Sequence, residues 1–487
     1  MIGRWMGCIA GFALIGSAAA RPALAQRQGQ FNGVQVTYRV DAAPLTVTTA
    51  EGGARIVGIS YIRTSDTPQT RRPVAFLFNG GPVAASLWIH LGVFGPKRVA
   101  VPTDLTNGPD AFRLVDNPLS PLDAADLVFV DPADTGFSRR TPGTPATAFA
   151  SVEADGAQVA AYIRQWLSTH ERDHAPVYLI GESYGTVRIP AVIDRLVKGP
   201  DPVTVDGAML LGQAVNIVEY AQRPANIVSY AVSLPTLAAT AWYHQRVERR
   251  GRSLATIIAE AQRYAQDSYL PALSRGGDLS PETRRAVATR LADLTGIPAT
   301  YYRDHDLRIT KEQFRIELLR DRHLLLGRND TRYVAAVSDK GGAPDPSDVI
   351  VKGFEGLWSS YWRNDLKIAA DLPYVPLAEV DGLEAWNWGG TSPFSDWPYA
   401  TPITAQFARN PHFRIIIANG IYDTQTTIGA ADYLRRQSGW PVDRTAYRIY
   451  GGGHMAYTDP QAAQAIATDV HALLTGTTLH AGRLGEP

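Results

Sequence analysis

The sequence predicts an α/β fold with a mostly parallel central sheet, and three observations support that prediction. Short apolar runs bounded by glycine, proline or charged residues indicate buried strands, and segments with apolar residues at helical spacing lie between them. Polar residues follow the ends of several runs, where a sheet of this class presents its chemistry. The predicted elements are buried strands at 74–78, 127–130, 177–180, 206–212, 413–417 and 445–450, a helix at 151–167, and alternating antiparallel edge strands at 34–40 and 54–62.

The most informative motif is the pentapeptide GESYG at 181–185, directly behind the apolar run 177–180. A strand that ends in Gly-x-Ser-x-Gly and enters a helix is the nucleophile elbow of an α/β-hydrolase, which holds the serine hydroxyl above the sheet. The glycines permit the strained backbone and its close packing. The motif therefore predicts this fold and Ser183 as nucleophile; without ordered partners, it would indicate only a glycine-rich turn.

The partners follow in the α/β-hydrolase order, an acid and then a histidine. Asp423 comes just past the strand at 413–417, and His454 follows the strand at 445–450 on a glycine-rich loop. A carboxylate in this role fixes the imidazole tautomer, and the other ring nitrogen removes the serine proton. Asp432 and Asp443 are alternative candidates for the acid. Asp423 is favoured because it lies just after a strand.

A glycine-rich loop supplies the remaining element of the predicted site. The strand at 74–78 runs into Asn79-Gly80-Gly81-Pro82. The Gly81 amide is a candidate for one half of an oxyanion hole, and the Tyr184 amide behind the nucleophile is the other.

At these residues the sequence resembles the serine carboxypeptidase family. Four blocks match in order: FNGGP at 78–82, VDPADTGFS at 130–138, GESYG at 181–185 and GGHM at 452–455. The resemblance spans roughly residues 70 to 475, with about 220–395 matching only in position as an insertion. It implies that Asn79 and Glu182 bind the C-terminal carboxylate of a substrate.

The sequence departs from the family pattern near this carboxylate site. In the family a second glutamate precedes a downstream Gly-Pro pair and shares a proton with the first, whereas here the corresponding position is Val93, before Gly95-Pro96. The segment 83–86 also differs from the family's usual sequence. Two close carboxyls raise one pKa so that a neutral acid can donate to a carboxylate, and a valine cannot take part.

The pattern changes to helices between about 217 and 400, and we expect a helical cap inserted over the active site. The predicted division is therefore 26–216 and 401–487 for the α/β-hydrolase core, with 217–400 as the cap. Predicted cap helices are 253–264, 280–294 and 310–326. The cap contains five closely spaced tryptophans, which either line a hydrophobic substrate cleft or form the core of a small domain: Trp358, Trp362, Trp386, Trp388 and Trp397. The cap helices are also candidates for a homodimer contact.

Residues 1–25 predict a secretory signal peptide, with Arg4, an apolar stretch and Ala23-Leu24-Ala25 before Gln26. We therefore expect export to the periplasm or the medium and no stable membrane span in the mature chain. The single cysteine is Cys8, so the mature chain has no disulfides. Because 47 basic residues balance 47 acidic ones, no overall charge attracts nucleic acid.

The segment His170-Glu171-Arg172-Asp173-His174 matches the zinc-binding pattern H-E-x-x-H. That chemistry needs both histidines one turn apart on a helix. Pro176 disfavours helical geometry at Ala175 and a strand begins at Val177, which favours a coincidental loop. No metal or cofactor is expected.

Together these residues predict an exported serine hydrolase, and the resemblance implies that it is a serine-type carboxypeptidase that acts on peptides or similarly acylated small molecules. Ser183 attacks, His454 transfers protons and Asp423 orients the imidazole. The same acyl-enzyme serves an esterase, an amidase or an acyltransferase, which stays open as an alternative. A binding protein with an inactive site is a third reading, and the ordered triad argues against it.

Overall fold

The computed structural model describes residues 26–65, 69–102, 104–199, 201–337, 344–368, 372–379, 384–390 and 399–477. The predicted signal peptide and Trp397 lie outside the described residues. Within these ranges, no helix combines the length and the apolar character that crossing a membrane requires.

The central sheet confirms the predicted α/β fold. Its strands lie in the order β1-β2-β4-β8-β5-β10-β11-β14-β15, antiparallel from β1 to β8 and parallel from there to β15, while β3 and β9 pair with β4. Their bounds are β1 Arg27–Phe31, β2 Val34–Asp41, β3 Leu45–Thr48, β4 Gly53–Arg63, β5 Val74–Phe78, β8 Asp126–Asp131, β9 Arg139–Arg140, β10 Val177–Glu182, β11 Val205–Leu211, β14 Arg414–Gly420 and β15 Thr445–Tyr450.

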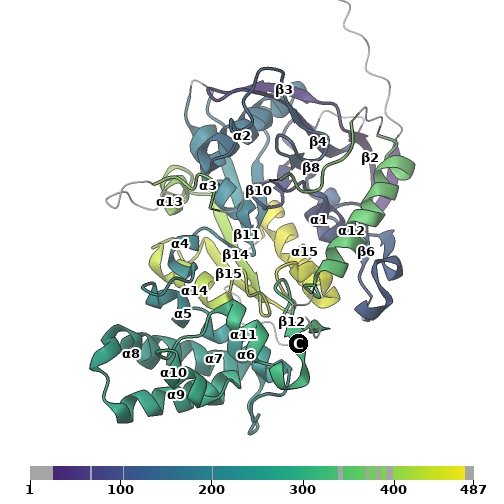
Figure 1. Ribbon diagram of the computed structural model, residues 1–487. Helices are drawn as coiled ribbons and strands as arrows, with labels where there is room; N and C mark the ends of the chain where they lie inside the picture. The colour runs from purple at the N-terminus through teal and green to yellow at the C-terminus, as the bar shows by residue number, and fades with distance from the viewer. Residues whose placement is uncertain are drawn as a thin grey trace, which may run out of the picture.

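Helices cover both faces of this sheet because alternate strand residues point to opposite sides. Phe76 and Phe78 of β5 join one apolar cluster, and Ala75 and Leu77 join the other. The first face carries α2 (Val152–Thr169), α3 (Tyr184–Val197), α13 (Ala400–Arg409) and α14 (Ile428–Gln437), and the second carries α1 (Leu87–Ile89), α12 (Asp348–Ser360) and α15 (Pro460–Thr475) (Figure 1).

A helical insert, defined here as residues 217–317, separates β11 from β14. Helices α5 to α11 have an apolar cluster of their own, whereas Tyr220 of α4 joins the cluster of the first face of the sheet. Helices α6 to α11 lie together at one end of the molecule, below the sheet in Figure 1. Ser253 and Ser280 accept hydrogen bonds from Thr256 N and Thr283 N, which fixes the starts of α7 and α9. The bounds are α4 Ile217–Tyr220, α5 Ile227–Ala231, α6 Leu234–Tyr243, α7 Leu254–Tyr264, α8 Leu270–Arg275, α9 Pro281–Thr295, α10 Ala299–Asp304 and α11 Lys311–Glu317.

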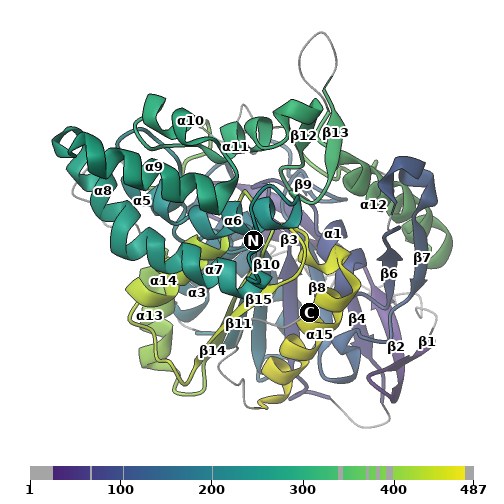
Figure 2. The same ribbon diagram turned by 90° about the horizontal axis from the view of Figure 1, so that it is seen from below.

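The helix predicted at 310–326 is wrong beyond Glu317. The chain turns at 320–322, His323 takes a left-handed φ of 54°, and the apolar run Leu324–Leu326 forms β12, which pairs with β13 (Val334–Ala336). A left-handed residue interrupts a right-handed helix, so the same leucines pair as a short strand. The adjoining hairpin lies beside the helical insert in Figure 2.

The apolar residues of the chain after this hairpin pack on the central sheet, while Asp345 pairs with Arg315 of the insert at 2.8 Å. Trp358 of α12 is buried in the apolar cluster of the second face, and Trp386 is buried in that of the first. The two tryptophans therefore belong to the apolar clusters of opposite faces of the sheet and do not form the core of one small domain. A second hairpin, β6 (Lys97–Ala100) with β7 (Arg113–Asp116), lies at the edge of the same face as α12.

Candidate active site

Ser183 occupies a strained turn between β10 and α3. Its φ of 58° and ψ of −127° are rare for a residue with a side chain. The Ser183 N–H donates to Leu211 O of the neighbouring strand at 2.9 Å, which ties the turn to the end of β11. This is the geometry of a nucleophile elbow.

Asp423 and His454 meet beyond the ends of β14 and β15. His454 Nδ1 lies 2.7 Å from Asp423 Oδ2. Asp423 is fully buried, and its Oδ1 accepts the N–H groups of Gln425 at 2.7 Å and Thr426 at 3.0 Å. A Cβ on Gly420 would lie 2.0 Å from Gly453 O, so the two loops approach this closely only because position 420 is glycine.

The imidazole lies next to the elbow. A Cβ on Gly212 would contact the His454 ring at 3.2 Å, and Gly212 directly follows the residue that binds Ser183 N–H. Because Nδ1 faces Asp423, Nε2 is the ring nitrogen that remains as a candidate base. Burial opposes the imidazolium, but the Asp423 carboxylate and then Glu182 outweigh it and raise the pKa of His454 above 6.5.

The two predicted oxyanion donors flank the same turn. A Cβ on Gly80 would lie 2.5 Å from Tyr184 N and 2.8 Å from Ser183 Cβ, so the glycine loop touches the elbow. Gly81 has a φ of 102°, where a side chain would be strained. Among the described residues, no acceptor receives the N–H of Gly81 or Tyr184, which leaves both amides available to an oxyanion.

A buried arginine fixes the glycine loop from below. Arg188 of α3 donates to Asn79 O at 2.7 Å and Pro82 O at 2.9 Å, and its Nε pairs with Asp155 Oδ2 at 2.7 Å. The arginine is fully buried. The helix that follows the nucleophile therefore also positions the loop that carries Gly81.

Glu182 lies beside the nucleophile with its carboxyl enclosed. Its Oε2 accepts from Asn79 Nδ2 and from the Tyr457 hydroxyl, each at 2.7 Å. Burial raises the pKa of Glu182 to about 7, against the opposing effects of His454, Tyr457 and Asn79. Both residues predicted to bind a carboxylate are thus brought together, and Tyr457 joins them.

Several residues that support the site were not predicted from the sequence. Tyr457 is three positions past His454, so a search for polar residues on that loop would have found it. Asn329 O accepts His454 N–H, and Lys311 Nζ donates to Gln425 O at 3.1 Å. Burial lowers the pKa of Lys311 to about 8. Both residues come from the chain between β11 and β14, and nothing local in the sequence connects them to the triad.

The H-E-x-x-H segment does not form a zinc site of the metalloprotease kind. Helix α2 ends at Thr169, and Glu171 has a φ of 57°. His170 Nε2 lies 3.0 Å from Asp41 Oδ2, while His174 lies exposed in the following loop. The two histidines are therefore not one helical turn apart on one face, as predicted from Pro176.

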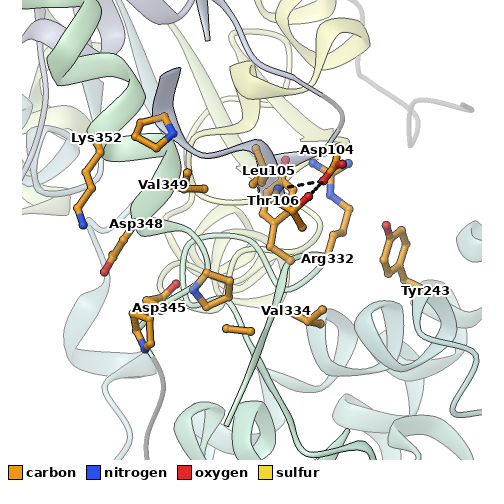
Figure 3. A pocket seen from close by; sticks show the side chains of 15 residues that line it. Asp104, Leu105, Thr106, Tyr243, Arg332, Val334, Asp345, Asp348, Val349 and Lys352 are labelled. Atoms are coloured by element: carbon orange, nitrogen blue, oxygen red, sulfur yellow. Dashed lines mark hydrogen bonds between the residues drawn. The ribbon is translucent and has the colours of Figure 1, made fainter. Parts of the chain in front are cut away.

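A separate hollow of about 560 Å³ lies between the insert and the core (Figure 3). Tyr243 of α6, Arg332, the hairpin strand β13, the 104–109 loop and the start of α12 line it. None of the three predicted triad residues is part of this lining. The ring centroids of Tyr243 and Tyr422, the neighbour of Asp423, lie 5.3 Å apart. The hollow is therefore close to the loop that carries Asp423, although Asp423 does not line it.

Comparisons with known proteins place this geometry in a family context. Residues 60–259 match the family model described as serine carboxypeptidase. A carboxypeptidase Y homolog of Arthroderma benhamiae is 29% identical over 177 residues, covering 36% of this chain and 31% of that protein. Serine carboxypeptidase-like 13 of Arabidopsis thaliana is 27% identical over 165 residues, covering 34% and 37%. The chain thus spans about a third of the length of these curated relatives.

The solved structure of a prohormone-processing carboxypeptidase from Saccharomyces cerevisiae has the same fold, with a TM-score of 0.51 at 14% identity. The similarity covers 90% of this chain and 91% of that one. The family-model match ends at residue 259, before Asp423 and His454. The acid and the base of the candidate triad therefore depend on the geometry described above.

Proposed function

We propose that this chain, which is related to the serine carboxypeptidases and has their α/β-hydrolase fold, is an exported serine carboxypeptidase that releases C-terminal residues from peptides. The observation that carries the proposal is the position of Glu182, a buried carboxyl held by Asn79 directly before the nucleophile. An esterase needs only the triad, whereas a carboxyl group at this position suits a substrate with a free terminal carboxylate.

The proposed chemistry gives each residue the role that its place in the candidate triad suggests. Ser183 Oγ attacks the scissile carbonyl carbon while His454 Nε2 removes the proton of the serine hydroxyl. Asp423 stabilises the resulting imidazolium. The amides of Gly81 and Tyr184 bind the oxyanion, each donor contributing roughly 2.7–4 kcal/mol to the transition state. His454 then protonates the leaving amine, and water hydrolyses the acyl-enzyme by the same route.

Recognition of the terminal carboxylate depends on the protonation of Glu182. As a neutral acid it donates a hydrogen bond to the substrate, and as an anion it repels it. With a pKa of about 7 for Glu182, recognition is present below neutral pH and fades above it. His454 must be neutral to remove the serine proton, and its pKa is raised. The rate of attack therefore increases as the pH rises.

Two further parts of the proposal concern the insert and the leader. Lys311 of the insert contacts the loop that carries Asp423, and Asn329, which follows the insert, contacts His454. These contacts support a cap over the site. The predicted signal peptide supports export with cleavage before Gln26. Mass spectrometry of the protein from its native compartment tests the second point, and a mature chain that begins at Met1 would contradict it.

The activity is tested with an N-blocked dipeptide, its C-terminal amide and a matched ester, from pH 5 to 8.5. We expect the free acid to exceed the amide in kcat/KM by about tenfold or more below pH 7, since a hydrogen bond to a charged group is worth roughly 1.5–3 kcal/mol. We expect the preference to shrink above pH 7. Hydrolysis of the ester but of neither peptide substrate at any pH would replace this proposal with an esterase or acyltransferase.

A further inference from the structure

The carboxyl group of Glu182 presents its two oxygens very differently. Oε2 receives two hydrogen bonds, from Asn79 Nδ2 and from the Tyr457 hydroxyl. Within the described part of the chain, no hydrogen bond reaches Oε1. The residue is buried, with 3% of its surface exposed, so its neighbours fix the orientation of the carboxyl.

Both donors are themselves oriented. Asn79 Oδ1 accepts the Ile89 N–H at 3.0 Å, which leaves the Asn79 NH₂ group to face Glu182. Burial, together with the charge of Glu182, raises the pKa of Tyr457 well above 10, so its phenol is a hydrogen-bond donor at every relevant pH. Two donors on Oε2 disfavour a proton there, and the proton of a neutral Glu182 is therefore directed to Oε1.

The space for the Tyr457 ring depends on Gly92. A Cβ at position 92 would lie 2.4 Å from the Tyr457 ring, inside any permitted contact. Val93, the next residue of the π-helical turn His90–Phe94, is fully buried in the apolar cluster of the second face. Because position 92 is glycine, the Tyr457 ring has room to pack there, and its hydroxyl reaches the Glu182 carboxyl. Tyr457 comes from the loop that carries His454.

We propose that Tyr457 is the specificity-determining partner of Glu182, and that it holds Oε2 so that Oε1 donates its proton to the terminal carboxylate of a peptide substrate. One phenol then takes the place of a second carboxyl. This inference rests on the proposed function, because it assumes that a terminal carboxylate binds at Glu182.

A single ionisable acid gives this site a distinctive dependence on pH. The charged groups that act on Glu182 are His454, which favours its anion, and Asp423, which opposes it. Tyr457 also favours the anion by its hydrogen bond. Removing the hydroxyl therefore has two consequences: the carboxyl loses its orientation, and its proton is retained to higher pH.

Tyr457→Phe tests the inference because it keeps the ring that packs on Gly92. The readout is the ratio of kcat/KM for an N-blocked dipeptide acid over its amide, per active site titrated with a fluorophosphonate. We expect the ratio to fall about ten- to a hundredfold below pH 7, chiefly through KM of the acid. We also expect the pH at which the remaining preference is lost to move upward.

The control is Tyr450→Phe, since Tyr450 is also buried and its hydroxyl also donates to a carboxylate, Asp469 Oδ2, at 2.7 Å. Its acid-to-amide ratio should match the wild type. Gly92→Ala, which displaces the ring, should lower the ratio as Tyr457→Phe does. In a Glu182→Gln background, Tyr457→Phe should change the ratio less than about twofold, because the pair acts as one unit.

The outcomes separate the two proposals. A wild type with no preference for the acid over the amide overturns the proposed function itself. A wild type with that preference, retained in full by folded Tyr457→Phe with an unmoved pH midpoint, overturns only the role of Tyr457. An equal loss in Tyr450→Phe would assign the effect to general destabilisation and also contradict the inference.

Discussion

The ion pair below the nucleophile and the outer ion pairs of the helical insert use charged residues in opposite ways. Around the elbow, Arg188 and Asp155 form an ion pair whose side chains are 0% and 2% exposed. In the insert, Arg290 and Glu260 pair at 3.1 Å with side chains 35% and 23% exposed. The first pair has no solvent to replace a lost partner, whereas the second has water at hand.

This difference implies different mechanical roles. The buried arginine holds the loop that carries Gly81, one of the two proposed oxyanion donors, and a rigid site of that kind needs no reorganisation during a reaction. The insert has its own apolar cluster and solvated outer ion pairs. It contacts the loop that carries Asp423 through Lys311 Nζ with Gln425 O and through a small apolar cluster that joins Ala239 and Ile258 to Ile421 and Tyr422. The candidate site is therefore built on the ends of the sheet's strands, and the insert contacts the loop that carries Asp423.

The largest expected effect comes from the buried triad acid. Asp423→Asn should lower kcat about 10⁴-fold, because an amide cannot hold the imidazole in the same tautomer or stabilise its cation. The control is Asp432→Asn, the rival acid, whose carboxylate instead pairs with Arg435 on the surface of α14. We expect it to change kcat less than about twofold. Steady-state kinetics on an ester decide, and equal losses would contradict the assignment.

Arg188→Met should have the next largest effect, on stability. It leaves Asp155 buried without its cation and the carbonyls of Asn79 and Pro82 without donors. Breaking a buried pair costs about 3–5 kcal/mol of unfolding free energy. Denaturant unfolding measures it. Asp155→Leu combined with Arg188→Met should recover part of the loss, and a single variant as stable as the wild type would refute the comparison.

Glu182 gives a smaller effect that depends on pH. Its pKa is about 7 in the folded chain against an ordinary 4.5, so the folded state retains the proton longer than the unfolded state. The wild type therefore loses stability as pH rises from about 4.5 to 7, by up to about 3 kcal/mol. Glu182→Gln, which does not titrate, should gain stability relative to the wild type across that window. A difference independent of pH would show that Glu182 is not buried as a neutral acid.

The smallest effect is expected in the insert. Arg290→Ala removes a half-exposed cation from Glu260 and Asp293, and surface pairs contribute about 0–1 kcal/mol. We expect a change in this range that shrinks in 0.5 M salt, measured by the same unfolding assay. A loss as large as that of Arg188→Met would remove the contrast between the two regions.

The sheet and the site's main residues could be predicted because their signals are local. The strand at 445–450 has the predicted bounds, and Ser183, Asp423 and His454 each follow a strand that ends at the same edge. Parallel strands bring such ends together whatever lies between them in the sequence. Helix starts at Ser253 and Ser280 were equally visible as caps.

What could not be predicted depends on contacts between distant segments. The hydroxyl of Tyr457 reaches Glu182 across 275 positions, through space that Gly92 leaves open. The leucines at 324–326 form a strand because a partner strand follows a turn, although their local pattern suits a helix. Trp358 and Trp386, close in sequence, belong to opposite faces of the sheet.

The central claim, that Ser183 is the nucleophile of a serine hydrolase, is tested most directly by covalent labelling. Purified protein is treated with a fluorophosphonate probe, digested, and analysed by peptide mass spectrometry. We expect one adduct, on Ser183, and none in a folded Ser183→Ala variant. An adduct on another residue, or labelling that persists in the variant, would contradict it.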